Sequence, residues 1–195
     1  MLQSAVPSTV EPKIEQQHTE TRSWARTALT LLGAARRFIV ISAIAFWLGG
    51  FTFYAGVAIP TGVEVLGTHK AVGFITQGVT RWLNVAGVFA LSIFLANFLL
   101  GWRQSSRGLK RLLLITWVVM VAIEIELFIL HPVLDRMLTT QPVREILDQD
   151  RFDLWHRVYL LSTSAQWFFG VAHVWGISLL WGKEKPWGQT VSAPT

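Results

Sequence analysis

Six polar or ionisable side chains lie inside or at the edge of stretches that are otherwise apolar, and their types and spacing suit chemistry. They are Glu124, His156, Tyr159, Thr163, Gln166 and His173. On a helix the last five fall, together with Gly170, within an arc of about 100°. A helix face with hydroxyl, amide and imidazole groups predicts either the lining of a cavity or a hydrogen-bonded seam between helices.

The partners of this helix face are predicted from the depth of each residue in the membrane and from the free-energy cost of exposing polar side chains to lipid. An ionisable group near the centre of a membrane span costs about 2.5–3.5 kcal/mol, so these side chains are expected to face inward. Glu124 is the nearest acidic candidate, at the level of Tyr159 and Thr163. Asn84 and Asn97 lie about 140° apart on one predicted helix, so only one of them is expected to join.

The candidate metal ligands are His69, His131, Asp135 and His156. Imidazole with carboxylate suits Cu(II) or Zn(II), but these residues come from three segments and form no compact ligand motif. The chain has no cysteine, which excludes thiolate ligands and thiol chemistry. The sequence specifies no cofactor, although haem or copper stays an alternative. It shows no catalytic constellation, which argues against an enzyme.

The elements that position these residues are four apolar stretches, each long enough to cross a bilayer core of about 30 Å. They are 38–59, 82–102, 112–130 and 158–181. The predicted fold is all-α: a polytopic membrane protein with four transmembrane helices in an antiparallel bundle. The positive net charge of +5 fits basic flanks of membrane helices, and no basic groove with interleaved aromatic residues predicts nucleic-acid binding.

Lysine and arginine are distributed unequally between the segments outside the stretches. Eleven fall on the side of the two termini and the 103–111 connection, and six fall on the other side. The positive-inside rule therefore places both termini in the cytoplasm. The predicted organisation is a cytoplasmic, partly disordered segment 1–34, a membrane domain 35–182 and a cytoplasmic tail 183–195. The location expected is a bacterial cytoplasmic (inner) membrane.

The first apolar stretch contains a series of small residues at alternating spacings of three and four. They are Ser42, Ala45, Gly49, Thr52 and Gly56. Small residues allow close approach of two backbones, so this series predicts a helix-packing surface. Pro60 is expected to end the helix, and segment 63–80 is expected to lie on the outer membrane surface as a short amphipathic helix.

Two short motifs resemble the transmembrane protein 205-like family of small four-helix membrane proteins, for which no function is known. One is the run from Phe46 to Gly50 with the exit Ile59–Pro60, and the other runs from Phe152 to His156 and Tyr159. The resemblance implies the order of spans and an aromatic-then-histidine start of the last span, and it implies no reaction. A second likeness, to four-helix modules of copper-resistance membrane proteins, lacks the Met-rich ligand pattern.

Three functional hypotheses follow. The first is a structural or accessory subunit of a larger membrane complex, such as an energy-transducing one, with lipid and other membrane-protein subunits or further copies of the chain as partners. The second is a small transporter or ligand-binding membrane protein that uses the polar face of the last span. The third is a membrane redox or metal protein that uses the outer histidines.

Overall fold

The computed structural model describes residues 11–102, 105–138 and 146–183. The described part is almost entirely helical and contains no strand, only one isolated antiparallel bridge between Leu138 and Ile146. The chain divides into two units, and the division falls inside the first helix, after Phe38. The description below concerns the second unit, residues 39–184.

The first helical stretch changes its winding twice. Helix α1 (Glu11–Ile44) is followed by the π-helical turn η1 (Ala45–Gly49), α2 (Gly50–Phe53), a second π-helical turn η2 (Tyr54–Ala58) and α3 (Ile59–Leu66). Pro60 lies in the first turn of α3, directly after the wide turn η2, and a proline is tolerated in a first turn. The helix therefore continues past Pro60, and the prediction that it ends there was wrong. It ends instead at Gly67, whose φ of 73° is left-handed.

The other helices are also longer than the apolar stretches within them. They are α4 (His69–Gly101), α5 (Arg107–Arg136) and α6 (Gln149–Lys183). Segment 63–80, predicted as a surface helix, is divided between the end of α3 and the first turns of α4, where the Thr68 hydroxyl caps the helix by accepting from the Ala71 amide at 3.2 Å. The segment predicted to be partly disordered contains helix from Glu11 onward.

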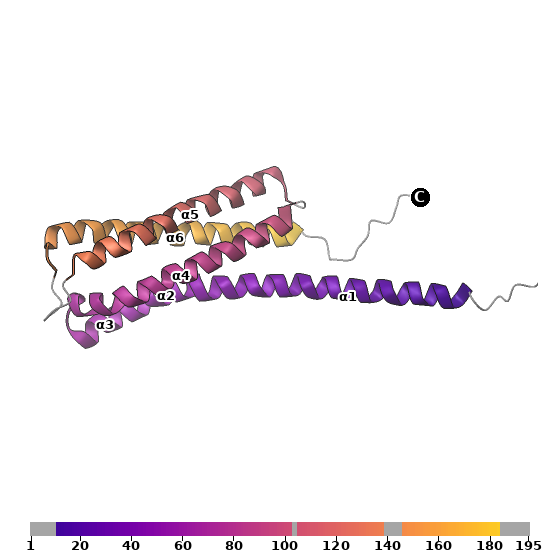
Figure 1. The fold of residues 1–195 in the computed structure, drawn as a ribbon, viewed down its shortest axis with the longest axis horizontal. Coiled ribbons are helices and arrows are strands. Elements are labelled where there is room, and N and C mark those ends of the chain that lie inside the picture. Colours follow the sequence, from indigo (N-terminus) through magenta and orange to yellow (C-terminus); the bar gives the residue numbers. More distant parts are fainter. Residues whose placement is uncertain (1–10, 103–104, 139–145, 184–195) are drawn as a thin grey trace, which may run out of the picture. The chain divides into compact units, whose positions relative to one another are not determined.

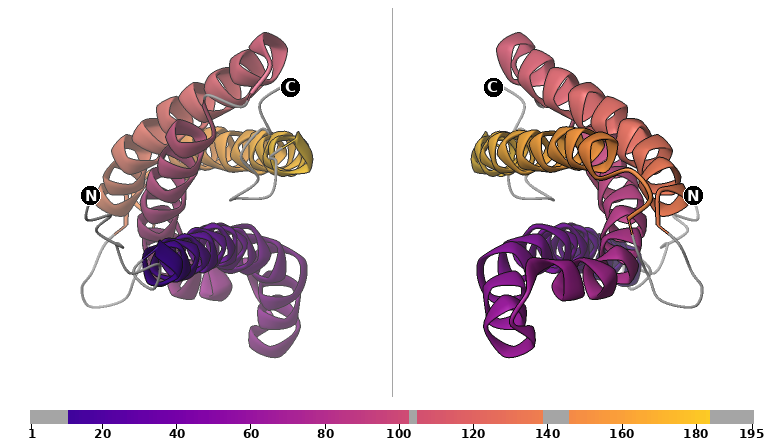
Figure 2. Two further views of the ribbon diagram at one scale, coloured as in Figure 1. Left: turned by 90° about the vertical axis from the view of Figure 1, so that its right-hand side faces the viewer. Right: turned by 90° about the vertical axis from the view of Figure 1, so that its left-hand side faces the viewer.

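Helix α4 is central in this unit. It contacts η1, α3 and α5, and α5 in turn packs most extensively on α6. Figure 1 shows α4, α5 and α6 along one another, and Figure 2 shows α4 between the first helical stretch and α5. A large apolar core joins all of them. Its most enclosed members are Val40, Phe94, Leu113, Met120, Ile177 and Leu180.

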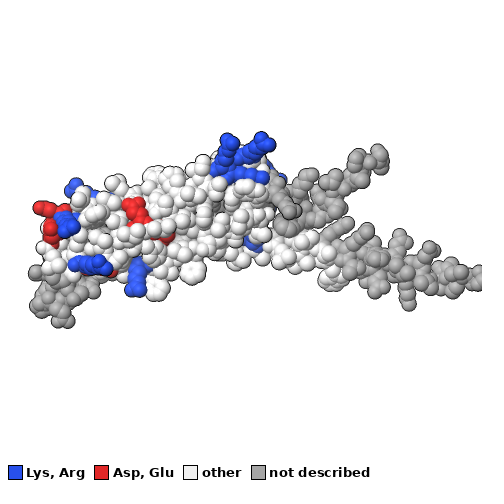
Figure 3. Space-filling view, turned by 45° about the horizontal axis from the view of Figure 1, so that its top comes forward, with Lys and Arg blue, Asp and Glu red and all other residues white. Residues whose placement is uncertain are grey.

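Among the described residues, three helices are long and apolar enough to cross a membrane: Ser23–Leu66, Ala71–Gly101 and Arg107–Arg136. Helix α6, which contains the predicted fourth span, is not among them, because the polar face lowers its mean hydropathy. On the face drawn in Figure 3 the acidic side chains gather at one end, Lys and Arg lie at both ends, and uncharged atoms fill the belt between.

The series of small residues in the first stretch is not buried within this chain, although the Trp167 indole N–H of α6 donates to the Thr52 hydroxyl at 3.0 Å. All five members are exposed, and a Cβ atom added at Gly49 or Gly56 would meet nothing within 4 Å. Trp47 and Leu48 are buried instead. Two causes account for this error: the π turns shift the helical register, and lipid makes the exposure of small or large apolar side chains almost free.

Candidate functional site

The centre of the helix packing contains a carboxylate bound to an amide. Glu124 on α5 is 4% exposed, and the Nε2 of Gln166 on α6 donates to its Oε2 at 2.6 Å. Gly87 on α4 faces this pair so closely that an added Cβ would lie 2.6 Å from the same oxygen. Three helices therefore meet at Glu124, and the absence of a side chain at position 87 makes room for its carboxylate.

About two turns further along α6, the imidazole of His173 is fully buried. Its Nδ1 lies 2.8 Å from the hydroxyl oxygen of Thr116 on α5, and the ring stacks on Phe94 of α4 with centroids 5.2 Å apart. Its Nε2 has no hydrogen-bond partner among the described residues. This contact links the same three helices a second time.

Both asparagines of α4 are buried, and only Asn84 binds a residue of the predicted polar face. The Tyr159 hydroxyl donates to Asn84 Oδ1 at 3.3 Å, and the Trp181 indole N–H donates to Asn97 Oδ1 at 3.4 Å. The hydrogen bonds therefore agree with the expectation that one asparagine joins this face.

Five of the six side chains singled out in the sequence are buried. We define the polar seam as these five together with their partners, namely Asn84, Thr116, Glu124, Tyr159, Thr163, Gln166 and His173. Thr163 bonds to its own helix, donating to the Tyr159 carbonyl at 2.9 Å. His156, the sixth, is exposed at the end of α6, so it is not buried in the bundle interior with the other five. In the first two turns of α6 the predicted polar face is therefore exposed, and it becomes buried from Tyr159 onward.

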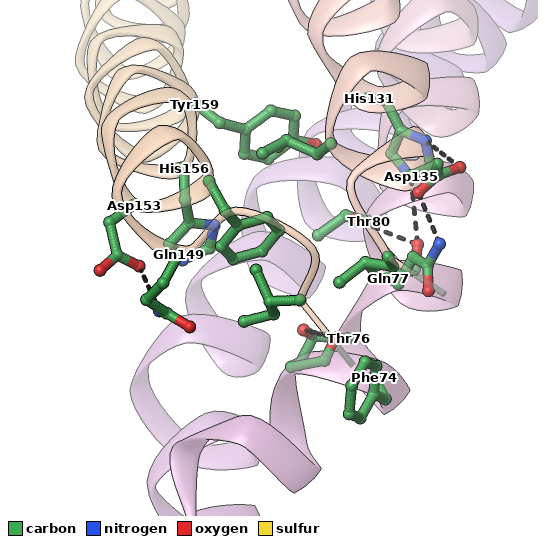
Figure 4. Close-up of a pocket in the computed structure, with 15 residues that line it drawn as sticks. Phe74, Thr76, Gln77, Thr80, His131, Asp135, Gln149, Asp153, His156 and Tyr159 are labelled. Atoms are coloured by element: carbon green, nitrogen blue, oxygen red, sulfur yellow. Dashed lines mark hydrogen bonds and ion pairs between the residues drawn. The ribbon is translucent and has the colours of Figure 1, made fainter. Parts of the chain in front are cut away.

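His156 instead lines a cavity of about 410 Å³ at this end of the unit, which we call the end pocket. Its polar wall comes from α4, α5 and α6 and includes Thr76, Gln77, His131, Asp135, Asp153 and His156. Its apolar wall includes Phe74, Leu134, Leu138, Ile146 and Phe152. Figure 4 shows the α6 side chains facing those of α4 and α5 across the cavity. Tyr159 borders the pocket and also belongs to the polar seam.

One side of the end pocket is a closed hydrogen-bond cluster. Gln77 Nε2 donates to Asp135 Oδ1 at 2.5 Å, and Asp135 Oδ2 lies 3.3 Å from His131 Nδ1. The other ring nitrogen of His131 lies 3.1 Å from the Gln77 carbonyl oxygen. Gln77 and His131 therefore each bind one carboxylate oxygen of Asp135 and hold its side chain in a single orientation.

The opposite side is less constrained. Gln149 Nε2 donates to Oδ1 of Asp153 at 3.0 Å, and the imidazole of His156 stacks on Phe152 with an interplanar angle of 9°. Partial burial lowers the pKa of His156, while the charge of Asp153 acts in the opposite direction. A neutral imidazole therefore faces the cavity near pH 7.

The candidate metal ligands do not converge into one site. His131 and Asp135 form a pair and His156 lies across the pocket, while His69 begins α4 and its side chain lies outside the described part. The described residues contain no group of three or more histidine and acidic side chains that could hold a metal ion.

Comparison with known proteins finds no matching family model, no similar curated protein and no similar solved structure. The functional argument therefore rests on the geometry of the polar seam and the end pocket.

Sequence reasoning expected one asparagine of α4 in the polar seam, but it missed Gly87 and the contribution of α4 to the end pocket. Gln77, Thr80, Asn84 and Gly87 follow one another at intervals of three, four and three residues, which on a helix describes a single face. That signal was present in the sequence. It was divided because segment 63–80 was predicted to be a separate surface helix and only 82–102 to be the second membrane span.

Proposed function

We propose that the protein is an integral membrane protein with four spanning helices in an antiparallel bundle, with both termini in the cytoplasm, in the bacterial inner membrane. The supporting evidence for α6 as the fourth span is its outward face: Leu161 and Phe168 are 72% and 68% exposed, whereas its polar residues are buried. An even number of spans also agrees with the eleven-to-six distribution of Lys and Arg.

Single introduced cysteines test this arrangement, because the chain has no cysteine of its own. Ser106→Cys precedes α5 and Asp150→Cys lies in the first turn of α6. In sealed membranes an impermeant maleimide is expected to label only Asp150→Cys from outside and only Ser106→Cys from inside. Labelling of both from one side would contradict four spans.

We further propose that the protein binds a small ligand in the end pocket. The supporting observation is that the end pocket is a cavity lined by side chains from three helices. In the polar seam, by contrast, side chains of neighbouring helices bind one another directly. Ligand sites of proteins have volumes of about 300–1,000 Å³ with apolar walls and a few converging polar groups. The closed seam argues against passage of a substrate along α6.

Two glycines on α4 allow a matched test. Gly73 lines the end pocket and Gly78 does not, and a Cβ at either position would meet nothing within 4 Å. Gly73→Leu is expected to fill the pocket without a clash, and Gly78→Leu is the control. In a thermal-shift screen of small molecules, a ligand of the pocket raises the unfolding temperature of the wild type and the control, but not of Gly73→Leu.

Two results would reject this function. One is a screen in which no compound raises the unfolding temperature of the wild type. The other is an equal shift in all three proteins, which would place binding elsewhere.

A second candidate function is the structural or accessory subunit, and the exposed small residues from Ser42 to Gly56 favour it. Nothing within the described chain covers Gly49, so Gly49→Leu is expected to leave the isolated chain stable. Native mass measurement in mild detergent tests the candidate. A larger assembly that Gly49→Leu dissociates would support it, and a monomer in both proteins would reject it.

A further inference from the structure

The charge in the end pocket is of one sign. Its lining contains the carboxylates of Asp135 and Asp153 and, among the residues that the structure describes, no Lys or Arg. Among the described residues of the lining, an anionic ligand would therefore meet two carboxylates and no Lys or Arg. The pocket favours a neutral or cationic ligand.

The N-terminus of α6 is the feature that would favour an anion, but the chain's own acidic residues already occupy it. Asp148 Oδ1 accepts from the Arg151 amide at 3.1 Å, and Asp150 lies in the first turn. These carboxylates offset the positive end of the helix dipole. The helix terminus therefore does not reverse the preference of the pocket.

The two carboxylates differ in what they can still bind. Asp135 uses one oxygen for Gln77 and the other for His131. Asp153 accepts from Gln149 at Oδ1 only, as far as the described residues show. A cationic group is therefore expected to lie against Asp153, where the neutral imidazole of His156 adds a hydrogen-bond acceptor and no opposing charge.

The walls suit an organic cation better than a metal ion. Phe74, Phe152 and Tyr159 line the cavity, and aromatic faces attract ammonium groups within about 6 Å of the ring centre. A Ca²⁺ or Mg²⁺ ion takes about six or more oxygen ligands in a compact shell, which a cavity of about 410 Å³ with apolar walls does not supply.

We propose that the end pocket binds an organic ammonium compound, with its cationic group against Asp153 and its apolar part among Phe74, Leu134 and Phe152. This inference rests on the proposed ligand-binding function and specifies the chemical class of the ligand. The ligand enters from the end of the helices, where the pocket lies, and would meet the polar seam at Tyr159, which borders the pocket.

Three probes with one aromatic body and different charges test the class. They are 2-phenylethylammonium, 2-phenylethanol and 3-phenylpropanoate, measured by titration calorimetry on the full chain in a non-ionic detergent. The ammonium is expected to bind at least about tenfold more tightly than the alcohol, and the carboxylate is expected to bind least. Gly73→Leu is expected to abolish binding of the ammonium and Gly78→Leu to retain it.

The role of the Asp153 side chain in binding is tested by a matched pair of variants on α6. Asp153→Asn is expected to weaken ammonium binding about five- to tenfold and to change alcohol binding less than about twofold, because only the charged probe uses the carboxylate. Asp150→Asn removes the same charge outside the lining and is expected to leave both affinities unchanged.

The outcomes separate the class of ligand from the function of the pocket. Binding of the alcohol or the carboxylate as tight as that of the ammonium, and sensitive to Gly73→Leu, would overturn the ammonium inference and leave the pocket function standing. Zinc or copper binding that Asp153→Asn or His156→Gln abolishes would overturn it in favour of a metal site. Absence of any binding sensitive to Gly73→Leu, for these probes and for the wider screen, would overturn both.

Discussion

The polar seam and the end pocket use the same kinds of side chain in different ways. In the seam, Gln166 and His173 bind directly to Glu124 and Thr116. In the end pocket, which Tyr159 also borders, histidine and aspartate side chains surround open space. The difference teaches that position along the helix, and not residue type, decides whether polar groups hold helices together or face a ligand.

The physical reason is access to water. Within the apolar core a polar group has no solvent to bind, so most polar groups of the seam pair with one another. Three buried seam atoms have no partner among the described residues, namely Glu124 Oε1, Gln166 Oε1 and His173 Nε2. At the end of the helices water can complete the hydrogen bonds of Asp153 and His156, so these groups tolerate a cavity. We therefore expect substitutions in the seam to change stability strongly, and substitutions in the pocket to change binding with little loss of stability.

The largest effect is expected at Glu124. Glu124→Ala leaves the Gln166 amide buried without its partner and opens a cavity, so the free energy of unfolding is expected to fall by about 2–4 kcal/mol. Glu124→Gln keeps the shape and can still pair, so it is expected to cost less than about 1 kcal/mol. Thermal and denaturant unfolding in detergent measures both. A loss below about 0.5 kcal/mol for Glu124→Ala would show that the seam does not stabilise the fold.

The next effect is expected at Gly87. A methyl group there would lie 2.6 Å from Oε2 of Glu124, so Gly87→Ala must displace the carboxylate from Gln166 and is expected to cost about 1–3 kcal/mol. Gly78→Ala, on the same helix with open space around it, is the control and is expected to be neutral or slightly stabilising. Equal stabilities of the two variants would contradict the close packing of α4 on the seam.

A smaller effect is expected at Thr116. Thr116→Val keeps the volume and removes the hydroxyl that contacts His173 at 2.8 Å, so it is expected to lower the free energy of unfolding by about 1 kcal/mol. Ser92→Ala removes a hydroxyl that bonds only to its own helix, at the Val88 carbonyl, and serves as the control. If the free energy of unfolding falls equally in both variants, the contact between Thr116 and His173 does not contribute to stability beyond the loss of a hydroxyl group.

The smallest effect is expected at His156, and it depends on pH. Partial burial holds the folded-state pKa of His156 below its usual range, so the unfolded chain binds the proton first as pH falls below about 6.5. The wild type is therefore expected to lose stability on acidification relative to His156→Gln, in the interval between the unfolded and the folded pKa. Unfolding midpoints of both proteins at pH 8 and pH 5 measure this difference. A difference of the opposite sign would place the imidazole in a setting that favours its charged form.

The sequence alone predicted an all-helical chain with apolar helices long enough for a membrane, because hydropathy and helical periodicity depend only on the order of residues. Periodicity also identified the buried face of α6: Tyr159, Thr163, Gln166 and His173 recur at helical spacing, and polar groups in an apolar helix have a strong energetic reason to turn inward. No comparable energy acts on small apolar residues. The series from Ser42 to Gly56 therefore had the right spacing for packing and yet is exposed.

The tertiary structure decided which residues meet. Glu124 binds Gln166, and not Tyr159 or Thr163, because of how α5 and α6 are positioned along each other's axes. Gly87 faces the same carboxylate because of the way in which α4 crosses these two helices. The end pocket also required the fold, since Asp135 and Asp153 belong to different helices and are brought to one cavity only by the packing of α5 on α6. The chain order determines each helix and its polar face, whereas heights, crossings and cavities arise from contacts between residues distant in the sequence.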